Sequence, residues 1–397
     1  MPRYAVLPGH EYKAFIPYTK VFLVDPPKKS HIYLNATITG LRPNHITLSK
    51  SFPELGFPDA TIPFDYAIYA LGSHLPPSLD LWKDCTTYHG SKAEGCAWLQ
   101  GKQKEVEGAP TVLVVGGGAL GIQFATDIKC VYPEKKVTLL HSRLRLLPRF
   151  DEKMHDEILS TCKEIGIELI LGERLDLDSI EEGSAKLNAQ GQKVVRTVTG
   201  REIAADLLML CTGQVPNTQL LKAMDPSVIN ESNHQVRVLR TLQLASAPAP
   251  VSETNAIADS MQELKVTESD SAPIVSITEP IIEEEKSPYP HIFAVGDAAD
   301  AFGAIAAGHN AYSQAELAAK NIIKLIAQDS EPKSERQALD RYTAGPPAIK
   351  VSLGLRKSVY QLGPTIGVKT DGHDDLQAAA IWPFFGLKVE KDEDMRV

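Results

Sequence analysis

The sequence predicts an α/β fold organised around a doubly wound, nucleotide-binding segment. Thr111–Val115 is a short, β-branched apolar run, which is typical of a strand buried on both faces of a parallel sheet. Gly116–Gly121 follows it with the spacing G-x-G-x-x-G, where a strand would turn into a helix. From Thr111 to about Gly213, apolar strands alternate with amphipathic helices in the order β-α-β-α-β. Together these observations predict a parallel sheet with helices on its faces.

The composition is that of an ordinary globular protein. With 397 residues the chain is long enough for two or three domains, and its 43% hydrophobic and 23% charged residues are unremarkable in proportion. The net charge of −9 argues against a nucleic-acid partner and against a polybasic membrane anchor. The five cysteines include no C-x-x-C pair, which favours a reducing compartment without a dithiol centre. No apolar run reaches the roughly 18 residues of a membrane span, and no signal-peptide pattern opens the chain.

The first 107 residues predict short strands separated by turns. Strand character is seen at Lys20–Val24, His31–Ile38, His45–Leu48 and Phe64–Gly72. Residues 84–107 predict a helix that leads into the glycine motif. We therefore expect a mainly β segment before the doubly wound region.

The central and C-terminal parts predict the remaining elements. The helices and strands expected up to residue 210 are Ala119–Val131, Lys136–Leu140, Glu152–Glu164, Glu168–Leu171 and Asp206–Leu210. Residues from about 245 to 288 are rich in Ala, Pro, Ser and Glu, which indicates a disordered surface insertion. A strand at His291–Asp297 follows, then a helix in the second half of 298–327 and strand-like pieces in the last fifty residues.

The glycine motif predicts a dinucleotide site. Gly116 allows the tight turn, Gly118 lets a pyrophosphate approach the backbone, and Gly121 lets helix and strand pack closely. The phosphates would lie on the N–H groups at the helix N-terminus. About 20 residues later the sequence offers His141 and Arg143 in place of the acid that binds the ribose of NAD. This favours the 2′-phosphate of NADP(H), because guanidinium pairs well with phosphate, although these arginines could equally be solvated loop charges.

Other candidate residues carry weaker signals when each is taken singly. Gly72 and Gly213 each end a strand and could admit a cofactor close to the backbone, although such glycines are more often turns. Asp297 follows an apolar strand and could bind a cofactor hydroxyl, but a plain helix cap is the more frequent role. No histidine pair has metal-ligand spacing and no G-x-S-x-G elbow occurs, so we expect neither a metal site nor a serine nucleophile.

Together these segments resemble the FAD-dependent pyridine nucleotide-disulfide oxidoreductase superfamily. The nearest resemblance is to the apoptosis-inducing-factor-like branch, which includes ferroptosis-suppressor-type NAD(P)H:quinone reductases. The matching stretches, in the order of the family, are YAIYALGS at 66–73, VLVVGGGALGIQFATDI at 112–128, KVTLLHSRLRLLPRFD at 136–151, DLLMLCTGQVPNT at 206–218 and HIFAVGDAAD at 291–300. The lack of C-x-x-C fits the single-flavin branch.

The resemblance implies two interleaved Rossmann-like nucleotide-binding domains, of the three-layer ββα/βα type, plus a small C-terminal α+β domain. Residues 109–220 would bind NAD(P)H, residues 1–108 and 221–340 would bind FAD, and residues 341–397 would form an interface domain. Gly296 and Asp297 match the family motif whose Asp contacts the FAD ribitol. Hydride would pass from nicotinamide to flavin and then to an acceptor such as a quinone. No side chain is assigned a catalytic role by this resemblance.

Two departures from the family leave alternatives open. Nothing before Pro110 matches the family's first β-strand–G-x-G-x-x-G–helix for FAD, so we expect the chain to begin after that unit. A truncated, non-catalytic NAD(P)H-binding sensor or interaction protein is therefore the alternative function, and a longer encoded protein is a third interpretation. Gln123 stands where many relatives have Glu, which weakens its assignment as an acid–base group.

The partners and location follow from the same reasoning. We expect a small-molecule electron acceptor, no nucleic acid and no transmembrane span, with peripheral membrane contact left open. A cytoplasmic location is expected, with a mitochondrial location as the alternative. The sequence leaves the oligomeric state and the choice between NADH and NADPH undecided.

Overall fold

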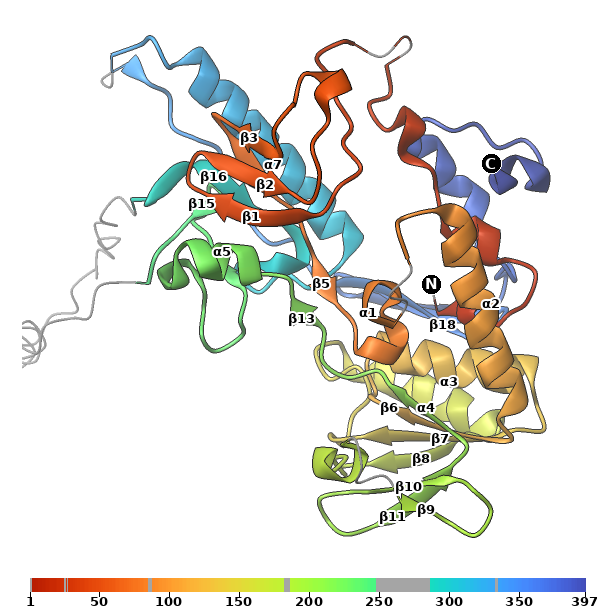
Figure 1. The fold of residues 1–397 in the computed structure, drawn as a ribbon. Helices are drawn as coiled ribbons and strands as arrows, with labels where there is room; N and C mark the ends of the chain where they lie inside the picture. The colour runs from red at the N-terminus through yellow and green to blue at the C-terminus, as the bar shows by residue number, and fades with distance from the viewer. Residues whose placement is uncertain are drawn as a thin grey trace, which may run out of the picture. The chain divides into compact units, whose positions relative to one another are not determined.

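The computed structural model divides the chain into two compact units. Unit 1 consists of residues 1–33, 74–215 and 346–397, and unit 2 of residues 34–73 and 216–345. The chain enters each unit more than once, so the units are interleaved, in agreement with the expected fold class (Figure 1). These units are defined by packing, whereas the expected domains were defined by the cofactor that each would bind. The expected boundaries of the cofactor-binding domains therefore stay a prediction. The described residues are 2–24, 26, 28–84, 88–181, 186–247, 286–332 and 335–397.

Unit 1 contains a four-stranded parallel sheet with the strand order β12-β6-β7-β8. Its strands are β6 (Thr111–Val115), β7 (Lys136–His141), β8 (Glu168–Leu171) and β12 (Leu207–Leu210). The central β6 is buried, which explains its continuous apolar sequence. At its carboxyl end, Val115 pairs with Leu140 on one side and Leu210 on the other. The carboxyl ends of these strands therefore share one edge of the sheet.

Side-chain caps mark the start of two helices of unit 1, α2 (Lys92–Gly108) and α4 (Glu152–Glu164). The same unit contains α1 (Leu81–Asp84) and α3 (Ala119–Val131). Ser91 and Glu94 form a reciprocal capping box at the start of α2, and the Asp151 carboxylate accepts the Lys153 N–H at the start of α4. The bounds expected for α3 and α4 are confirmed. The helix expected over 84–107 begins only at Lys92, because the capping box fixes its first turn.

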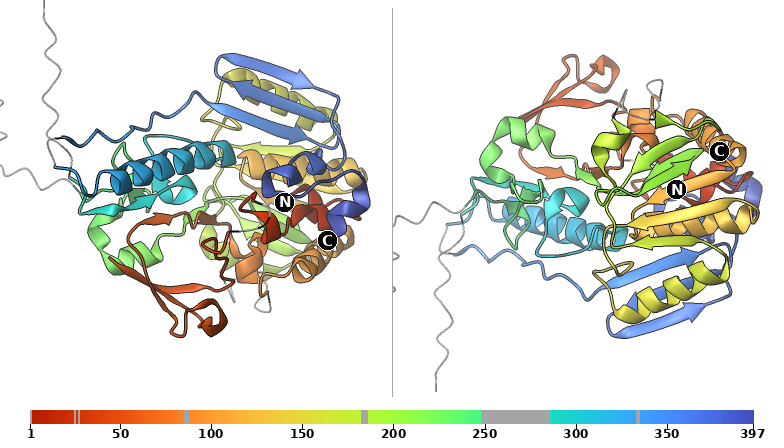
Figure 2. Two further views of the ribbon diagram at one scale, coloured as in Figure 1. Left: turned by 90° about the horizontal axis from the view of Figure 1, so that it is seen from above. Right: turned by 90° about the horizontal axis from the view of Figure 1, so that it is seen from below.

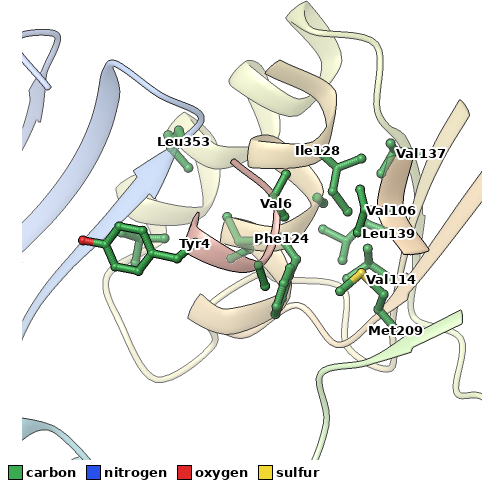
Figure 3. Packing of buried hydrophobic residues seen from close by; sticks show 14 of the residues in the cluster. Tyr4, Val6, Val106, Val114, Phe124, Ile128, Val137, Leu139, Met209 and Leu353 are labelled. Carbon is green, nitrogen blue, oxygen red and sulfur yellow. The ribbon is translucent and has the colours of Figure 1, made fainter. Parts of the chain in front are cut away.

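A hydrophobic cluster joins α3 to the sheet. Phe124 and Ile128 of α3 are buried against Val114 of β6 and Leu139 of β7, and Val6 from the N-terminal segment joins them (Figure 3). Each fully buried side chain of this kind contributes about 1.5–3 kcal/mol to stability. The cluster therefore holds the N-terminus of α3 at a fixed place relative to the end of β6.

Two antiparallel sheets complete unit 1. One has the order β11-β10-β9, with strands Glu202–Ala205, Lys193–Arg196 and Lys186–Leu187, and was not expected from the sequence. The other is the meander of β18 (Ala348–Leu353), β19 (Lys357–Leu362) and β20 (Thr365–Lys369). It lies beside α4 (Figure 2), where Lys357 Nζ and Glu157 Oε1 are 2.7 Å apart. This meander confirms the strand-like pieces expected near the C-terminus.

A buried ion pair ties the N-terminal segment to α3. The side chains of Arg3 and Asp127 are each 1% exposed, and Arg3 Nε lies 2.9 Å from Asp127 Oδ2. Arg3 also donates to the carbonyls of Gly354 and Asp374. Burial raises the pKa of Asp127, and the adjacent Arg3 opposes that rise. Removal of one member of a buried pair typically costs about 3–5 kcal/mol, so this pair fixes the segment firmly.

The described residues of unit 2 form three small sheets and two helices. The sheets have the orders β1-β2-β3, β15-β16-β4 and β14-β17. Their strands are Ile38–Arg42, His45–Leu48, Thr61–Pro63, Gln243–Leu244, Tyr289–Ala294, Ala67–Tyr69, Val236–Arg237 and Ala299–Asp300. Strands β16 and β4 are parallel, so their carboxyl ends lie side by side. The helices are α5 (Gln219–Met224) and α7 (Gly308–Ala327).

The remaining elements are short. Strands β5 (Ser73–His74) and β13 (Val215–Pro216) lie where the chain passes from one unit to the other. Single 3₁₀ turns lie at Arg3–Ala5, Glu11–Ala14, Tyr18–Lys20, Pro53–Leu55, Pro77–Leu79, Leu177–Ile180, Pro226–Val228, Gly296–Ala298, Ala378–Ala380, Trp382–Phe385 and Asp392–Arg396.

Several expected strands are wrong or too long. Residues 20–24 form a 3₁₀ turn and a further turn, and of the expected strand His31–Ile38 only Ile38 belongs to β1. The strand expected at Phe64–Gly72 is confirmed only over Ala67–Tyr69. Aromatic and β-branched residues favour a strand only where a partner strand is available, and these residues have none. The insertion expected at about 245–288 lies almost entirely outside the described residues.

Candidate functional site

The glycine loop of unit 1 joins the end of β6 to the start of α3. Gly116 adopts a φ of +123°, and a Cβ built there would lie 2.7 Å from the Cys211 carbonyl oxygen. A Cβ on Gly121 would lie 1.9 Å from the carbonyl oxygen of Gly116. Real Cβ atoms do not approach backbone oxygens so closely, and neither carbonyl can move without disturbing the sheet. Both positions therefore require glycine, for the reasons that the motif predicted.

Gly118 has a different role in the same loop. It is the N-cap of α3, no side chain caps the helix there, and a Cβ built on it would meet no atom within 4 Å. The first N–H groups of α3 therefore face open space beside Gly118. A helix N-terminus with free N–H groups and no side chain in front of it suits an anionic phosphate. The geometry here fits the pyrophosphate of a dinucleotide.

The side chain of His141, at the end of β7, turns inward to the glycine loop. Its Nδ1 accepts the backbone N–H of Gly117 at 3.0 Å, and its Nε2 lies 3.1 Å from the carbonyl oxygen of Arg145. Nδ1 is therefore the unprotonated nitrogen, and Nε2 donates to Arg145. Burial lowers the pKa of His141, while the bond to the Arg145 carbonyl raises it and the charge of Arg143 lowers it. Both ring nitrogens are thus used within the protein.

Arg143 is the exposed basic residue beside this histidine. Its backbone carbonyl accepts the Gly172 N–H at 3.1 Å, which fixes the start of the loop after β7. Within the described part of the chain, no carboxylate pairs with its guanidinium. The guanidinium therefore remains available to a negative group at the edge of the sheet where the glycine loop lies.

Gly213 lies beyond the end of β12, the neighbour of β6 in the parallel sheet. It has a φ of +73°, and a Cβ there would meet no atom within 4 Å. Because Leu210 pairs with Val115, the turn after β12 lies at the same sheet edge as the glycine loop. The structure thus brings together five of the expected residues, which are Gly116, Gly118, Gly121, His141 and Gly213.

A second cluster of expected residues lies in unit 2. Gly296 has a φ of +72° and follows β16, while Gly72 has a φ of +64° and follows the parallel neighbour β4. The Asp297 carboxylate accepts a hydrogen bond of 3.0 Å from the Ser73 hydroxyl. These residues therefore lie at one edge of the β15-β16-β4 sheet, in an arrangement parallel to that in unit 1.

The turn at Gly296 borders a small hollow lined by six alanines and Ile305. Gly296, Asp297, Gln235, Asn310 and Gln314 contribute its other walls. The N-terminus of α7 opens onto the same place, since its N-cap Ala307 has no side-chain cap. Carboxylate, amide and free helix N–H groups beside small side chains fit a hydroxylated, phosphate-bearing group such as part of FAD.

Three functional contacts were not expected from the sequence. Ser73 was given no role from the sequence, yet it orients Asp297 from 224 positions away. Gln314, which is 2% exposed, accepts the Gly296 N–H at 2.7 Å. Gly117 stands at an unspecified position of the G-x-G-x-x-G spacing, but its N–H binds His141. The extra glycine at 117, between Gly116 and Gly118, was the only sequence signal for any of these.

The cysteines of the described residues are thiols that packing holds protonated. Cys96, Cys130, Cys162 and Cys211 form no disulfide. Burial raises the pKa of all four, to about 12 for Cys162 and Cys211. Cys211 packs beside the glycine loop, so its thiol serves packing at that edge and not nucleophilic chemistry.

Two further observations concern the described residues only. No group of three or more His, Cys, Asp or Glu side chains is arranged to hold a metal ion in that part of the chain. Across the same residues, no helix has both the length and the apolar character needed to cross a membrane.

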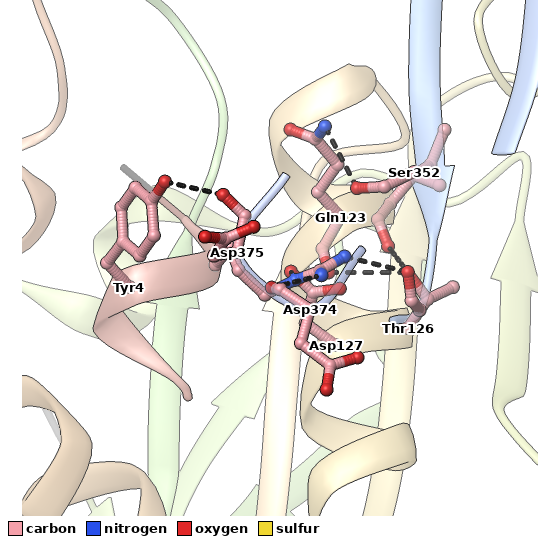
Figure 4. A network of polar contacts seen from close by, with 10 residues as sticks. Tyr4, Gln123, Thr126, Asp127, Ser352, Asp374 and Asp375 are labelled. Atoms are coloured by element: carbon pink, nitrogen blue, oxygen red, sulfur yellow. Dashed lines mark hydrogen bonds and ion pairs between the residues drawn. The ribbon is translucent and has the colours of Figure 1, made fainter. Parts of the chain in front are cut away.

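Gln123 of α3 donates a hydrogen bond to the Ser352 hydroxyl at 3.2 Å (Figure 4), so its amide is used in packing.

Comparisons with known proteins agree with this geometry. The family model described as pyridine nucleotide-disulphide oxidoreductase matches residues 28–242. Fe-regulated protein 8 of Mycosarcoma maydis is 37% identical over 396 residues, covering 98% of this chain and 85% of the relative. Apoptosis-inducing factor homolog B of Dictyostelium discoideum is 25% identical and covers 92% of this chain and 80% of the relative. Human ferroptosis suppressor protein 1 is 34% identical over 147 residues, 36% of this chain and 37% of the relative.

Solved structures show the same fold. A water-forming NADH oxidase from Lactobacillus brevis, bound to NADH, has a TM-score of 0.51 at 19% identity, over 82% of this chain. A ferredoxin reductase from Rhodopseudomonas palustris has a TM-score of 0.52 at 15% identity, also over 82% of this chain. The chain spans 58% and 63% of the lengths of these two proteins.

Proposed function

Because this chain belongs to the pyridine nucleotide-disulphide oxidoreductase family, we propose that it passes hydride from NAD(P)H to FAD and then to a quinone. The family is one of FAD-dependent NAD(P)H oxidoreductases, and it binds these two cofactors. When bound, a flavin supplies the two-electron chemistry between the nicotinamide and the acceptor. The protein's contribution is to bind and orient, which suits a site without a nucleophile.

The observation that carries this proposal is the open helix N-terminus at Gly118. We assign the NAD(P)H pyrophosphate to the N–H groups of α3, with Gly116 and Gly121 keeping the loop tight enough to present them. Arg143 lies where the ribose of the dinucleotide would end, and its guanidinium suits the 2′-phosphate of NADPH. Gly213 leaves room beside the same loop.

We assign FAD to the second cluster, in unit 2. Asp297, oriented by Ser73, would accept a hydrogen bond from a ribitol hydroxyl. Gly72 and Gly296 themselves place no side chain beyond the carboxyl ends of β4 and β16. The two proposed cofactor sites therefore rest on separate residues and can be tested separately.

A quinone is the acceptor that the similarity to ferroptosis suppressor protein 1 supports. A quinone kept in a lipid phase would require peripheral contact with a membrane, and we propose a cytoplasmic location for the protein. Oxygen or a partner protein as acceptor would be recognised by the absence of quinone-dependent NAD(P)H consumption.

The first test uses the purified chain. We expect a yellow protein with a flavin absorbance band that oxidises NAD(P)H when a water-soluble short-chain quinone is added. A colourless protein that binds NAD(P)H but takes up no added FAD would overturn the enzymatic function. It would favour the alternative, a non-catalytic NAD(P)H-binding protein.

The second test addresses the NAD(P)H site alone. Gly118→Ala places a methyl group in the space proposed for the pyrophosphate without touching any protein atom. We expect the KM for NAD(P)H to rise about tenfold, which corresponds to about 1.4 kcal/mol, with the flavin content unchanged. Gly108→Ala, where a Cβ is also unhindered, is the matched control. An unchanged KM in Gly118→Ala would place the pyrophosphate elsewhere.

A further inference from the structure

His141 occupies the position at which NAD-binding proteins of this fold have an acidic residue that binds the ribose. In this chain the side chain turns away from that role. Nδ1 accepts the Gly117 N–H and Nε2 donates to the Arg145 carbonyl, so one ring joins the glycine loop to the loop after β7. A second bond runs between the same two loops, from the Leu147 N–H to the Gly117 carbonyl oxygen at 2.9 Å.

The fit between Gly117 and His141 is steric as well as polar. A Cβ built on Gly117 would lie 2.5 Å from His141 Cγ and 2.6 Å from Leu146 Cδ2. The backbone of Gly117 has no positive φ, so the need for glycine comes from the His141 ring and the Leu146 side chain and not from the turn. Gly117, the middle one of three consecutive glycines, therefore leaves the space that the His141 ring occupies.

We propose that His141 is a positioning residue for NAD(P)H. Through its contact with Gly117, it fixes the glycine loop and the loop that contains Arg143 relative to each other. The inference rests on the proposed binding of NAD(P)H at Gly116–Gly121. Gly118 directly follows Gly117, and Arg143 follows His141 by two residues, so the contact adjoins both residues that would meet the phosphates. The ring must be neutral to hold Gly117, because a protonated Nδ1 cannot accept a hydrogen bond.

The charged and titratable groups around the ring come from three places. Arg143 and Arg145 lie in its own loop, and His155 of α4 accepts the Leu146 N–H at 3.0 Å. After β8, Glu173 donates its N–H to the His141 carbonyl, and its carboxylate is paired with Arg201. The glycine loop itself contributes no titratable side chain. Burial and Arg143 favour the neutral ring, so protonation should release Gly117 only below the usual pKa of histidine.

The experiment measures binding of NADPH and NADH to the full chain by their fluorescence, from neutral pH down to about pH 5. We expect His141→Ala to weaken both dinucleotides about tenfold at neutral pH, while His89→Ala, at an exposed histidine, changes nothing. Asparagine offers an acceptor near the place of Nδ1 and does not titrate in this range. His141→Asn should therefore bind nearly as well as the wild type and lose most of the weakening seen at low pH.

Gly117→Ala gives an independent readout. Its methyl group would push the imidazole ring out of this contact, although residue 141 is still a histidine. We therefore expect the same loss of dinucleotide affinity as in His141→Ala, and little added loss in the double variant. Wild-type affinity in His141→Ala, or a pH profile of His141→Asn equal to that of the wild type, would overturn the proposal. Because dinucleotide binding needs no acceptor, a failure of quinone reduction would leave this result intact, and the two proposals fail separately.

Discussion

The glycine loop of unit 1 and the Gly296 turn of unit 2 both follow a strand of a parallel pair, yet they are built differently. In unit 1 the backbone itself demands glycine, since Cβ atoms on Gly116 and Gly121 would strike carbonyl oxygens. In unit 2 the φ of +72° at Gly296 also favours glycine, but a Cβ there would meet only Ala311 Cβ, at 3.3 Å, and no carbonyl oxygen. There the turn is held by side chains, through Gln314 on the Gly296 N–H and Ser73 on Asp297.

This difference separates two ways of shaping a nucleotide site. A loop shaped by backbone packing tolerates no substitution at its contact points, and its motif is visible in the sequence. A turn held by hydrogen bonds from distant residues can lose one of these bonds and keep its backbone conformation. Substitutions in the two regions should therefore differ in the size of their effect and in what they affect.

The largest expected effect belongs to Gly121→Ala. The new methyl group would meet the Gly116 carbonyl oxygen at 1.9 Å, so α3 must shift away from β6. We expect a loss of about 3 kcal/mol in the free energy of unfolding, and a fall in Tm of roughly 6–12 °C by circular dichroism.

The control for this change is Gly101→Ala in α2, where a Cβ meets no atom. Alanine favours a helix over glycine by roughly 0.5–1 kcal/mol, so the control should be neutral or slightly stabilising. If Gly121→Ala were as stable as this control, the backbone demand for glycine would be refuted.

A smaller effect is expected at Gln314. Gln314→Leu keeps the approximate volume but leaves the Gly296 N–H without its acceptor, which should cost about 2 kcal/mol in the free energy of unfolding. Urea denaturation measures this loss. Glu316→Leu, at an exposed position of the same helix, should stay within about 0.5 kcal/mol of the wild type. Equal stability of the two variants would show that the Gly296 turn does not depend on this bond.

The smallest effect is expected at Ser73. Ser73→Ala removes one hydrogen bond to Asp297, which is worth about 1 kcal/mol and a roughly fivefold weaker affinity for FAD. Titration of flavin-free protein with FAD, followed by flavin fluorescence, measures it. Ser73→Thr retains the hydroxyl and should restore the affinity. Wild-type affinity in Ser73→Ala would remove Ser73 from the proposed flavin site.

The sequence by itself determined the parts whose signals are local. Short stretches of sequence predict the strand Thr111–Val115 and the helices Ala119–Val131 and Glu152–Glu164. They also predict the need for glycine at 116 and 121. Periodicity, caps and the motif spacing act over a few residues, so they can be read without knowledge of the fold. The same signals were misleading at residues 20–24, where strand-forming residues found no partner strand.

Only the tertiary structure decided which residues support the two candidate sites. Ser73 reaches Asp297, Gln314 reaches Gly296, and His141 reaches Gly117, each from another element of the fold. A hydrogen bond depends on distance and direction in space, and sequence separation carries no information about either. For this reason the motif predicted where a nucleotide would bind, whereas tertiary packing determined which side chains fix the conformation of that loop.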